Sequence, residues 1–215
     1  MEPKEWTFMN KEGWGDGPWQ EEPDKLQWTD AETGLPCLIV RNGVGALCGY
    51  VGVSEGHPLF MIKYSDCSLP HAKPRGERPQ DKEPVFGRVM PESMLQRIRE
   101  RRVCDGEWCG HTPEHLLEVH GGITFSDFCQ PDREHGICHF PSPGEPERVW
   151  WLGFDCAHSG DLSPKMNSHL SAEWQERFGD RDTYRTVAYV QAQCAQLARQ
   201  LAALQPSSRS RRASA

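Results

Sequence analysis

The sequence has no long hydrophobic run. No stretch approaches the roughly 20 consecutive apolar residues that cross a bilayer as a helix. The first residues, Met1 to Glu5, carry neither the cationic segment nor the apolar segment of a secretion signal. We therefore expect a cytoplasmic protein that is neither exported nor embedded in a membrane.

Positive charge is also scarce. The 215 residues include 24 Lys and Arg against 31 Asp and Glu, which gives a formal net charge of −7. Proteins bind duplex nucleic acid through many phosphate contacts, which need a concentrated Lys and Arg surface. The composition therefore argues against a duplex partner. A small nucleotide stays open, because a few Arg side chains, backbone N–H groups or a metal ion can hold its phosphates.

Two nucleotide-binding motifs are missing. The chain contains no G-x-x-x-x-G-K-[ST] and no G-x-G-x-x-G. These glycine-rich loops hold phosphates in kinase-like and dinucleotide-dependent proteins. The sequence therefore lacks the motifs that usually indicate either class of protein.

Short strands are present instead. The runs 35–41 and 46–53 flank the turn-forming pair Asn42-Gly43 and predict a hairpin. The run 149–154 is almost continuously apolar, which indicates an interior strand buried on both faces. Gly49 and Gly52 interrupt the second arm of the hairpin, so we expect another group to approach its backbone closely there.

One long helix is predicted over 183–204. Its apolar residues recur at steps of three and four, namely Val187, Val190, Cys194, Leu197, Leu201 and Leu204. Shorter helices are expected over 91–102 and 112–119, each with a proline in its first turn. Together the elements predict an α+β fold, with a small, mainly antiparallel sheet and the long C-terminal amphipathic helix packed on it.

The domain organisation follows from composition. A chain of 215 residues predicts one main core. Residues 1–27 are rich in Trp and Gly without a period, so we expect an irregular arm, either held to the body by its tryptophans or disordered. Residues 28–205 form the single domain, with a mobile loop of prolines and charges at 65–84. Residues 206–215 are expected to be a disordered basic tail.

The cysteines number nine, an odd count. In a chain without an export signal this predicts reduced thiols, several of them small core residues. A structural zinc site is a less favoured alternative, with candidate ligands Cys104, Cys109, His111, Cys129, Cys138 and His139. Cys156 is a poor candidate nucleophile, because its acidic neighbour Asp155 would raise the pKa of its thiol.

Candidate site residues stand where strands end. Asp155, His158 and Asp161 follow the buried strand at intervals of three, and carboxylate and imidazole groups are common metal ligands. His120 precedes Gly121 and Gly122 at a helix-to-strand junction. His57 follows the hairpin. The alternative for each is a local bond to the backbone, such as a cap or a turn.

Four blocks of the sequence resemble a family of uncharacterised proteins carried by bacteriophages and prophages. These are 28–58, 119–125, 149–164 with GFDCAHSGD, and 184–197, about a third of the chain. The resemblance implies a phage-encoded protein that acts in the host cytoplasm, where such accessory proteins often interfere with defence signalling. It implies no settled activity.

The candidate residues and the resemblance lead to one hypothesis. A divalent metal ion (Zn, Mn or Mg) bound by Asp155, His158 and His57 would activate water, and His120 or Asp161 would move protons. Contacts to the substrate, a phosphodiester or nucleotide signal, would come from Gly121, Gly122 and Tyr50.

Two alternatives remain at this stage. A non-catalytic nucleotide sponge would stack the base on Trp150 or Trp151. An inhibitor of a host protein would bind through the N-terminal tryptophans and the 65–84 loop. The sequence also leaves open a homo-oligomer.

Overall fold

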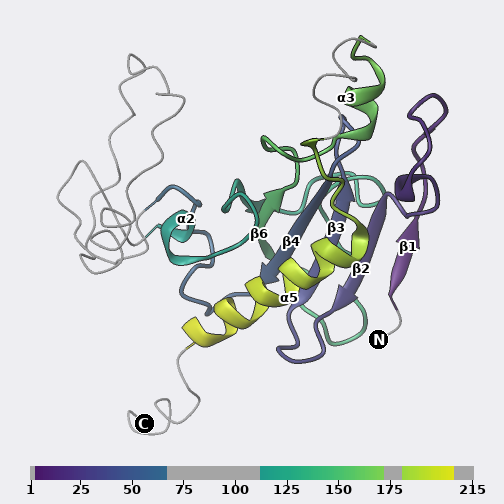
Figure 1. Cartoon of the computed structure of the whole chain (residues 1–215). Coiled ribbons are helices and arrows are strands. Elements are labelled where there is room, and N and C mark those ends of the chain that lie inside the picture. Colours follow the sequence, from purple (N-terminus) through teal and green to yellow (C-terminus); the bar gives the residue numbers. More distant parts are fainter. Residues whose placement is uncertain (1–2, 67–111, 172–180, 206–215) are drawn as a thin grey trace, which may run out of the picture.

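A computed structural model describes residues 3–66, 112–171 and 181–205 of the chain. Six strands form one sheet in the order β1-β2-β3-β4-β6-β5, in which every pair is antiparallel, and a long helix crosses one face (Figure 1). The strands are β1 (Lys4–Trp6), β2 (Lys25–Thr29), β3 (Pro36–Arg41), β4 (Leu47–Val53), β5 (Phe125–Phe128) and β6 (Trp150–Asp155); the helices are η1 (Pro18–Gln20), α2 (Pro113–Leu116), α3 (Pro164–Ser168) and α5 (Val187–Leu204). The predicted α+β fold is confirmed.

Both faces of the sheet are covered in its centre. On one face the core contains Leu152 and Phe154 of β6 together with Val190, Cys194 and Leu197 of α5. On the other face, a second cluster gathers residues from β3, β4 and β6 with the segment before β6: Leu38, Val40, Cys48, Tyr50, Ile137, Val149 and Trp151. The strand β6 lies between β4 and β5, so the prediction of an interior strand is confirmed.

The hairpin is also confirmed, as β3 and β4. The turn begins at Asn42, and its left-handed residue is Gly45, with φ +89°. A Cβ on Gly49 would lie 2.5 Å from the Phe154 ring and 2.8 Å from the Cys194 sulfur. The groups that approach this backbone are therefore core side chains, and no ligand is needed to explain the glycine.

The N-terminal arm differs from the expectation of an irregular segment. Residues 4–6 form β1, which pairs with β2, and β2 itself begins at Lys25 inside the expected arm. Trp14 and Trp19 are buried. The alternative in which tryptophans hold the arm to the body is the one that the structure supports.

Asp24 holds this arm in place. Its buried carboxylate accepts hydrogen bonds from the backbone N–H groups of Phe8 and Met9, at 2.9 and 2.8 Å. It also pairs with Lys11 Nζ at 3.0 Å and with Arg41 Nε at 2.9 Å. An unpaired charge in such a place costs several kcal/mol, so these partners stabilise one another only as a set.

The arm also caps the long helix. The Glu22 carboxylate accepts a bond from Val187 N, at the first residue of α5, at 2.7 Å. Thr186 is the N-cap, and its side chain accepts from Tyr189 N. An anion at a helix N-terminus is favourable because the first N–H groups have no partner within the helix. The helix consequently starts at Val187, four residues after the predicted start at 183.

Some predicted boundaries change or lie outside the described residues. The helix predicted over 112–119 is the short α2, because Leu117 adopts an extended conformation. The helix at 91–102, most of the 65–84 loop and the 206–215 tail fall outside the described ranges. Within those ranges, no helix combines the length and the apolar character needed to cross a bilayer.

Replacing Asp24 by Ala should lower the free energy of unfolding by about 3 to 5 kcal/mol, because Lys11 would stay buried without its counter-charge and Arg41 would keep only the longer pair with Glu22, at 3.7 Å. Urea denaturation followed by tryptophan fluorescence measures this. Asp127→Ala is the matched control, because its ion pair with Lys63 is about half exposed, and it should cost about 1 kcal/mol or less. Equal losses in the two variants would show that Asp24 does not anchor the arm.

Candidate functional site

Three predicted residues from two separate segments meet beside the start of α5. His120 comes from the loop between α2 and β5, and His158 and Asp161 come from the loop after β6. His120 Nε2 lies 2.7 Å from Asp161 Oδ2. One nitrogen of each imidazole and one oxygen of the Asp161 carboxylate all lie within 4.8 Å of one another. The convergence expected for His120, His158 and Asp161 is therefore present.

The Asp161 carboxylate is the centre of this cluster. Besides His120, it accepts bonds from Arg185 Nε at 2.8 Å and from the backbone N–H of His158 at 3.1 Å. Burial acts to raise the pKa of this carboxyl, but the hydrogen bonds that it accepts outweigh burial and lower the pKa from its ordinary 3.8. Asp161 is thus an anion near neutral pH.

The polar side of α5 supplies partners that the sequence analysis did not identify. The Tyr189 hydroxyl lies 2.9 Å from His120 Nδ1, and Gln193 Oε1 accepts the His120 backbone N–H at 2.9 Å. Tyr189 and Gln193 are spaced four residues apart, so they share one side of α5, and Arg185 lies two residues before the helix begins. That spacing was readable in the sequence beside the apolar stripe, although nothing there showed what it would face.

His158 is the least constrained member of the cluster. Its Nδ1 atom is buried and has no hydrogen-bond partner within the described part of the chain. A Cβ on Gly121 would overlap the His158 ring, and Gly121 has φ +66°. Glycine is therefore required at 121 for two reasons, its backbone conformation and the space that the imidazole occupies. Gly122 also has a positive φ, +87°, but a Cβ there would meet nothing.

Asp155 lies at the edge of the cluster. Its Oδ1 is 3.7 Å from His158 Nδ1 and accepts Ala157 N at 3.1 Å, while its Oδ2 accepts Thr124 Oγ1 at 2.9 Å. The Asp155 side chain is 31 % exposed. It caps the turn after β6, as the local alternative predicted, and still has a carboxylate oxygen near His158.

Two predicted residues lie elsewhere. His57 uses both ring nitrogens on the backbone, with Nε2 3.0 Å from Leu201 O and Nδ1 accepting Leu59 N at 3.0 Å. Leu201 is twelve residues beyond Tyr189, or about 18 Å along the helix axis. The assignment of His57 as a metal ligand is therefore wrong, because the local alternative describes it.

Tyr50 is on the opposite face of the sheet. It is 6 % exposed and belongs to the second core cluster, where its ring meets Phe125 edge-on. A one-residue change along a strand reverses the direction of the side chain. Tyr50 is therefore a core residue and cannot contact a substrate at this cluster, which corrects its predicted role.

The tryptophans named in the two alternatives are also buried in the fold. Trp150 and Trp151 are 3 % and 0 % exposed, and Trp150 Nε1 donates to Ile62 O at 3.1 Å. They offer no face on which a base could stack. Trp14 and Trp19 are buried with the arm, so removal of the arm would damage the fold and could not isolate a role in protein binding.

The cysteines depart from the prediction in one place. Cys37, Cys48, Cys156 and Cys194 are free and buried, as expected for core thiols. Cys129 and Cys138, however, form a disulfide, so the expectation of reduced thiols is wrong for this pair. Burial raises the pKa of the Cys156 thiol well above its ordinary 9.0, which agrees with its low rank as a nucleophile. Cys104, Cys109 and His111 lie outside the described residues.

A short glycine-serine motif lies at the end of β4. Residues Gly52 to Gly56 read G-V-S-E-G and match G-x-S-x-G, the nucleophile turn of α/β-hydrolases. That motif needs a strand, a sharp turn and a helix in succession, but β4 is followed by turns through residue 61. The nearby His57 has no free nitrogen to serve as base for Ser54. The match is therefore not a catalytic serine site.

No family model, curated protein or solved structure matches the chain. The function is therefore inferred from the residues of the cluster.

The cluster has the donor set of a divalent-metal site. Two imidazole nitrogens and one carboxylate oxygen suit zinc and other transition metals better than magnesium, which prefers oxygen ligands. Tyr189 holds the remote nitrogen of the His120 ring, as outer partners do in metal sites.

The two adjacent glycines give a matched test. Gly121→Ala and Gly122→Ala should each lower stability by about 1 kcal/mol, because both positions have positive φ. Only Gly121→Ala should displace the His158 ring, and it should therefore weaken Zn²⁺ or Mn²⁺ binding by about tenfold or more. Isothermal titration calorimetry on the protein with its disulfide intact measures both affinities. Equal metal affinities for the two variants would show that His158 is not a metal ligand.

The charge of Asp161 gives a test by pH. Its folded-state pKa is lowered, so its stabilising contribution is present above the ordinary value and is lost as pH falls through the folded value. Asp161→Asn should cost about 2 to 4 kcal/mol at pH 7, and this difference from wild type should shrink below about pH 4. Urea denaturation with a chelator present gives the profile, and the exposed Asp16→Asn serves as control. A difference independent of pH would show that the Asp161 charge is not what stabilises the fold.

Proposed function

We propose that His120, His158 and Asp161 bind one divalent transition-metal ion and that the protein is a metal-dependent hydrolase acting on a phosphodiester or nucleotide signal. The observation that carries the proposal is the convergence of three ligand atoms from two distant segments, with His158 Nδ1 buried and without a hydrogen-bond partner in the described residues. A buried polar atom of this kind calls for a partner, and among the described residues it has carboxylate oxygens of Asp155 and Asp161 at 3.7 and 3.8 Å, which is beyond hydrogen-bond distance.

The hydrogen bonds around His120 are compatible with an ion. Without metal, Nε2 donates to Asp161 and Nδ1 accepts from the Tyr189 hydroxyl. With metal, Nε2 would lose its proton and bind the ion, and Nδ1 would donate to the same hydroxyl, which can both donate and accept. The imidazole and the Asp161 carboxylate, now 2.7 Å apart, would separate to about 3.3 Å to take the ion between them, and Tyr189 would stay the partner of the ring in both states.

The ion would lower the pKa of a bound water so that hydroxide forms near neutral pH. Asp155 is the carboxylate placed to take that proton, because its Oδ1 faces His158 and its side chain is partly exposed. Hydroxide would attack phosphorus, the P–O bond to the leaving group would break, and the leaving oxygen would take a proton from solvent. The products are a phosphomonoester and an alcohol.

Arg185 favours an anionic substrate. It binds Asp161 through Nε and lies over the Tyr189 ring at 5.0 Å. No hydrogen bond to its terminal nitrogens is found within the described residues, so they are placed to meet a phosphate oxygen beside the ion. A role in the host cytoplasm as a phage accessory protein that evades defence signalling is part of the same proposal, and its support is the resemblance of the sequence blocks.

Two substitutions separate metal binding from catalysis. His158→Ala should lose both the bound ion and the hydrolysis of cyclic and linear nucleotides. Asp155→Asn should keep about one ion per chain and lose about 100-fold in turnover, because only the proton acceptor is removed. Metal analysis by atomic emission and product analysis by chromatography measure the two effects, and the exposed Asp127→Asn serves as control.

The same experiment identifies the alternatives. If a nucleotide were recovered intact from the denatured complex, the protein would be a non-catalytic nucleotide sponge and not a hydrolase. Protein that binds no Zn²⁺ or Mn²⁺ and alters no nucleotide would end the metal-hydrolase proposal and leave the binding of a host protein to be tested.

A further inference from the structure

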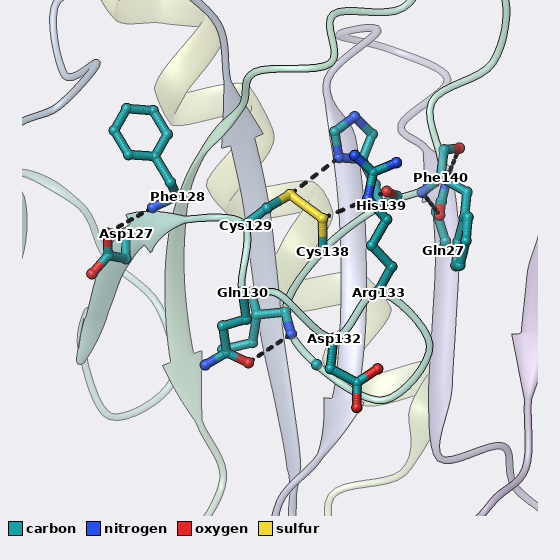
Figure 2. Close-up of a disulfide and its surroundings, with 12 residues drawn as sticks. Gln27, Asp127, Phe128, Cys129, Gln130, Asp132, Arg133, Cys138, His139 and Phe140 are labelled. Atoms are coloured by element: carbon teal, nitrogen blue, oxygen red, sulfur yellow. Dashed lines mark hydrogen bonds between the residues drawn. A yellow bond between two sulfur atoms is a disulfide. The ribbon is translucent and has the colours of Figure 1, made fainter.

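A second set of metal-binding atoms lies on the other side of the molecule. Cys129 follows β5, the loop 130–137 returns to Cys138, and His139 is the next residue (Figure 2). The two sulfurs and one imidazole nitrogen lie within 4.8 Å of one another. Cys138 and His139 are buried, and the His139 ring meets Trp151 of the second core cluster edge-on.

The hydrogen bonds of His139 show which nitrogen faces the sulfurs. Its Nε2 lies 2.9 Å from the carbonyl oxygen of Pro146. Because a carbonyl oxygen only accepts, Nε2 must carry the proton, and in the neutral ring Nδ1 carries none. This Nδ1 lies 3.7 Å from the Cys129 sulfur (Figure 2). An imidazole that donates one N–H to a carbonyl and presents its other nitrogen to thiol sulfurs has the usual arrangement of a metal ligand.

The loop does not depend on the disulfide alone. Gln130 N donates to Ile137 O, and Ile137 N donates to the Gln130 side chain, each at 3.0 Å. The buried Lys25 donates to the carbonyl oxygens of Arg133 and Gly136. These bonds would keep the two sulfurs close together after reduction, so the sulfurs would face His139 in either redox state.

The distance between the Cys129 sulfur and the His139 nitrogen suits a tetrahedral ion. With a metal–sulfur distance of about 2.3 Å and a metal–nitrogen distance of about 2.0 Å, sulfur and nitrogen ligands stand about 3.5 Å apart. The observed separation of Cys129 Sγ and His139 Nδ1 is 3.7 Å. Cys129 also lines a cavity of about 320 Å³ with Phe128, Arg133, Glu147, Arg148 and Val149. That cavity offers a route for the ion and room for a water or carboxylate as fourth ligand.

We propose that Cys129, Cys138 and His139 form a redox-controlled metal site, which holds one Zn²⁺-like ion when both cysteines are reduced and releases it when they form the disulfide. A peroxide supplies the oxidising equivalents. The two metal-bound thiolates, one H₂O₂ and two protons give one disulfide, one free divalent ion and two molecules of water. Reduction by a thiol or phosphine reverses the step. This site is independent of the proposed hydrolase, because it shares no residue with the first cluster.

Cobalt is the probe of choice, because Co²⁺ bound to thiolates shows a charge-transfer absorption that a site of nitrogen and oxygen ligands lacks. The test uses the full chain carrying Cys67→Ser, Cys104→Ser and Cys109→Ser, so that thiols outside the described residues do not contribute. The phosphine-reduced protein should bind one equivalent of Co²⁺ with this band, and the disulfide form should show none. Zn²⁺ should displace the cobalt, and H₂O₂ should release one equivalent of Zn²⁺ to a chelating dye.

His139→Asn should weaken Co²⁺ binding by about tenfold or more while both thiols still react with a thiol reagent. His135→Asn is the matched control, since His135 stands on the same loop, is half exposed and binds Asp132; its Co²⁺ affinity should equal that of wild type. Circular dichroism confirms that each variant is folded. The proposal is overturned if the reduced protein shows no thiolate band, if His139→Asn binds as wild type does, or if the ion stays bound after oxidation.

Discussion

The candidate site depends on one carboxylate, that of Asp161. It joins three segments that are distant in sequence, namely the loop after β6, the loop before β5 and the residues that lead into α5. A carboxylate has about four lone-pair positions, so it can accept from His120, from Arg185 and from a backbone N–H at once. The same group therefore positions one histidine, and through the backbone the other, and would also bind the ion. A change at Asp161 therefore affects the hydrogen bonds of all three segments at once.

The support for this cluster extends to the N-terminal arm. Glu22 caps the first turn of α5, and its other oxygen accepts the Tyr184 hydroxyl at 2.6 Å. Arg41 contacts the same hydroxyl at 2.8 Å and pairs with Asp24. The start of α5 is thus held by Glu22 of the arm and by Arg41, which is itself paired with Asp24. The arm is part of the scaffold of the site, although it lies outside the central strands.

The two groups of candidate metal ligands differ in kind and in place. Nitrogen and oxygen donors meet beside α5, whereas sulfur and nitrogen donors meet in the loop after β5, next to the second core cluster. Thiolates are lost on oxidation, but carboxylates and imidazoles are not. Only the sulfur-containing group can therefore respond to redox conditions, and its proposed role does not require the chemistry of the other.

The elements that local pattern specifies were predictable. Of the five proposed catalytic and metal-binding positions, three meet in one cluster. The apolar run of β6, the hairpin of β3 and β4 and the stripe of α5 each bury a face at the period of their own structure. His120, His158 and Asp161 were identified because they stand where such elements end. Only the tertiary structure showed that His57 bonds to α5, that Tyr50 faces the opposite core, that Tyr189 and Arg185 complete the cluster, and that Cys129 lies against Cys138. These facts depend on which strands are neighbours and which way each side chain points, and contacts between distant segments leave no period in the sequence.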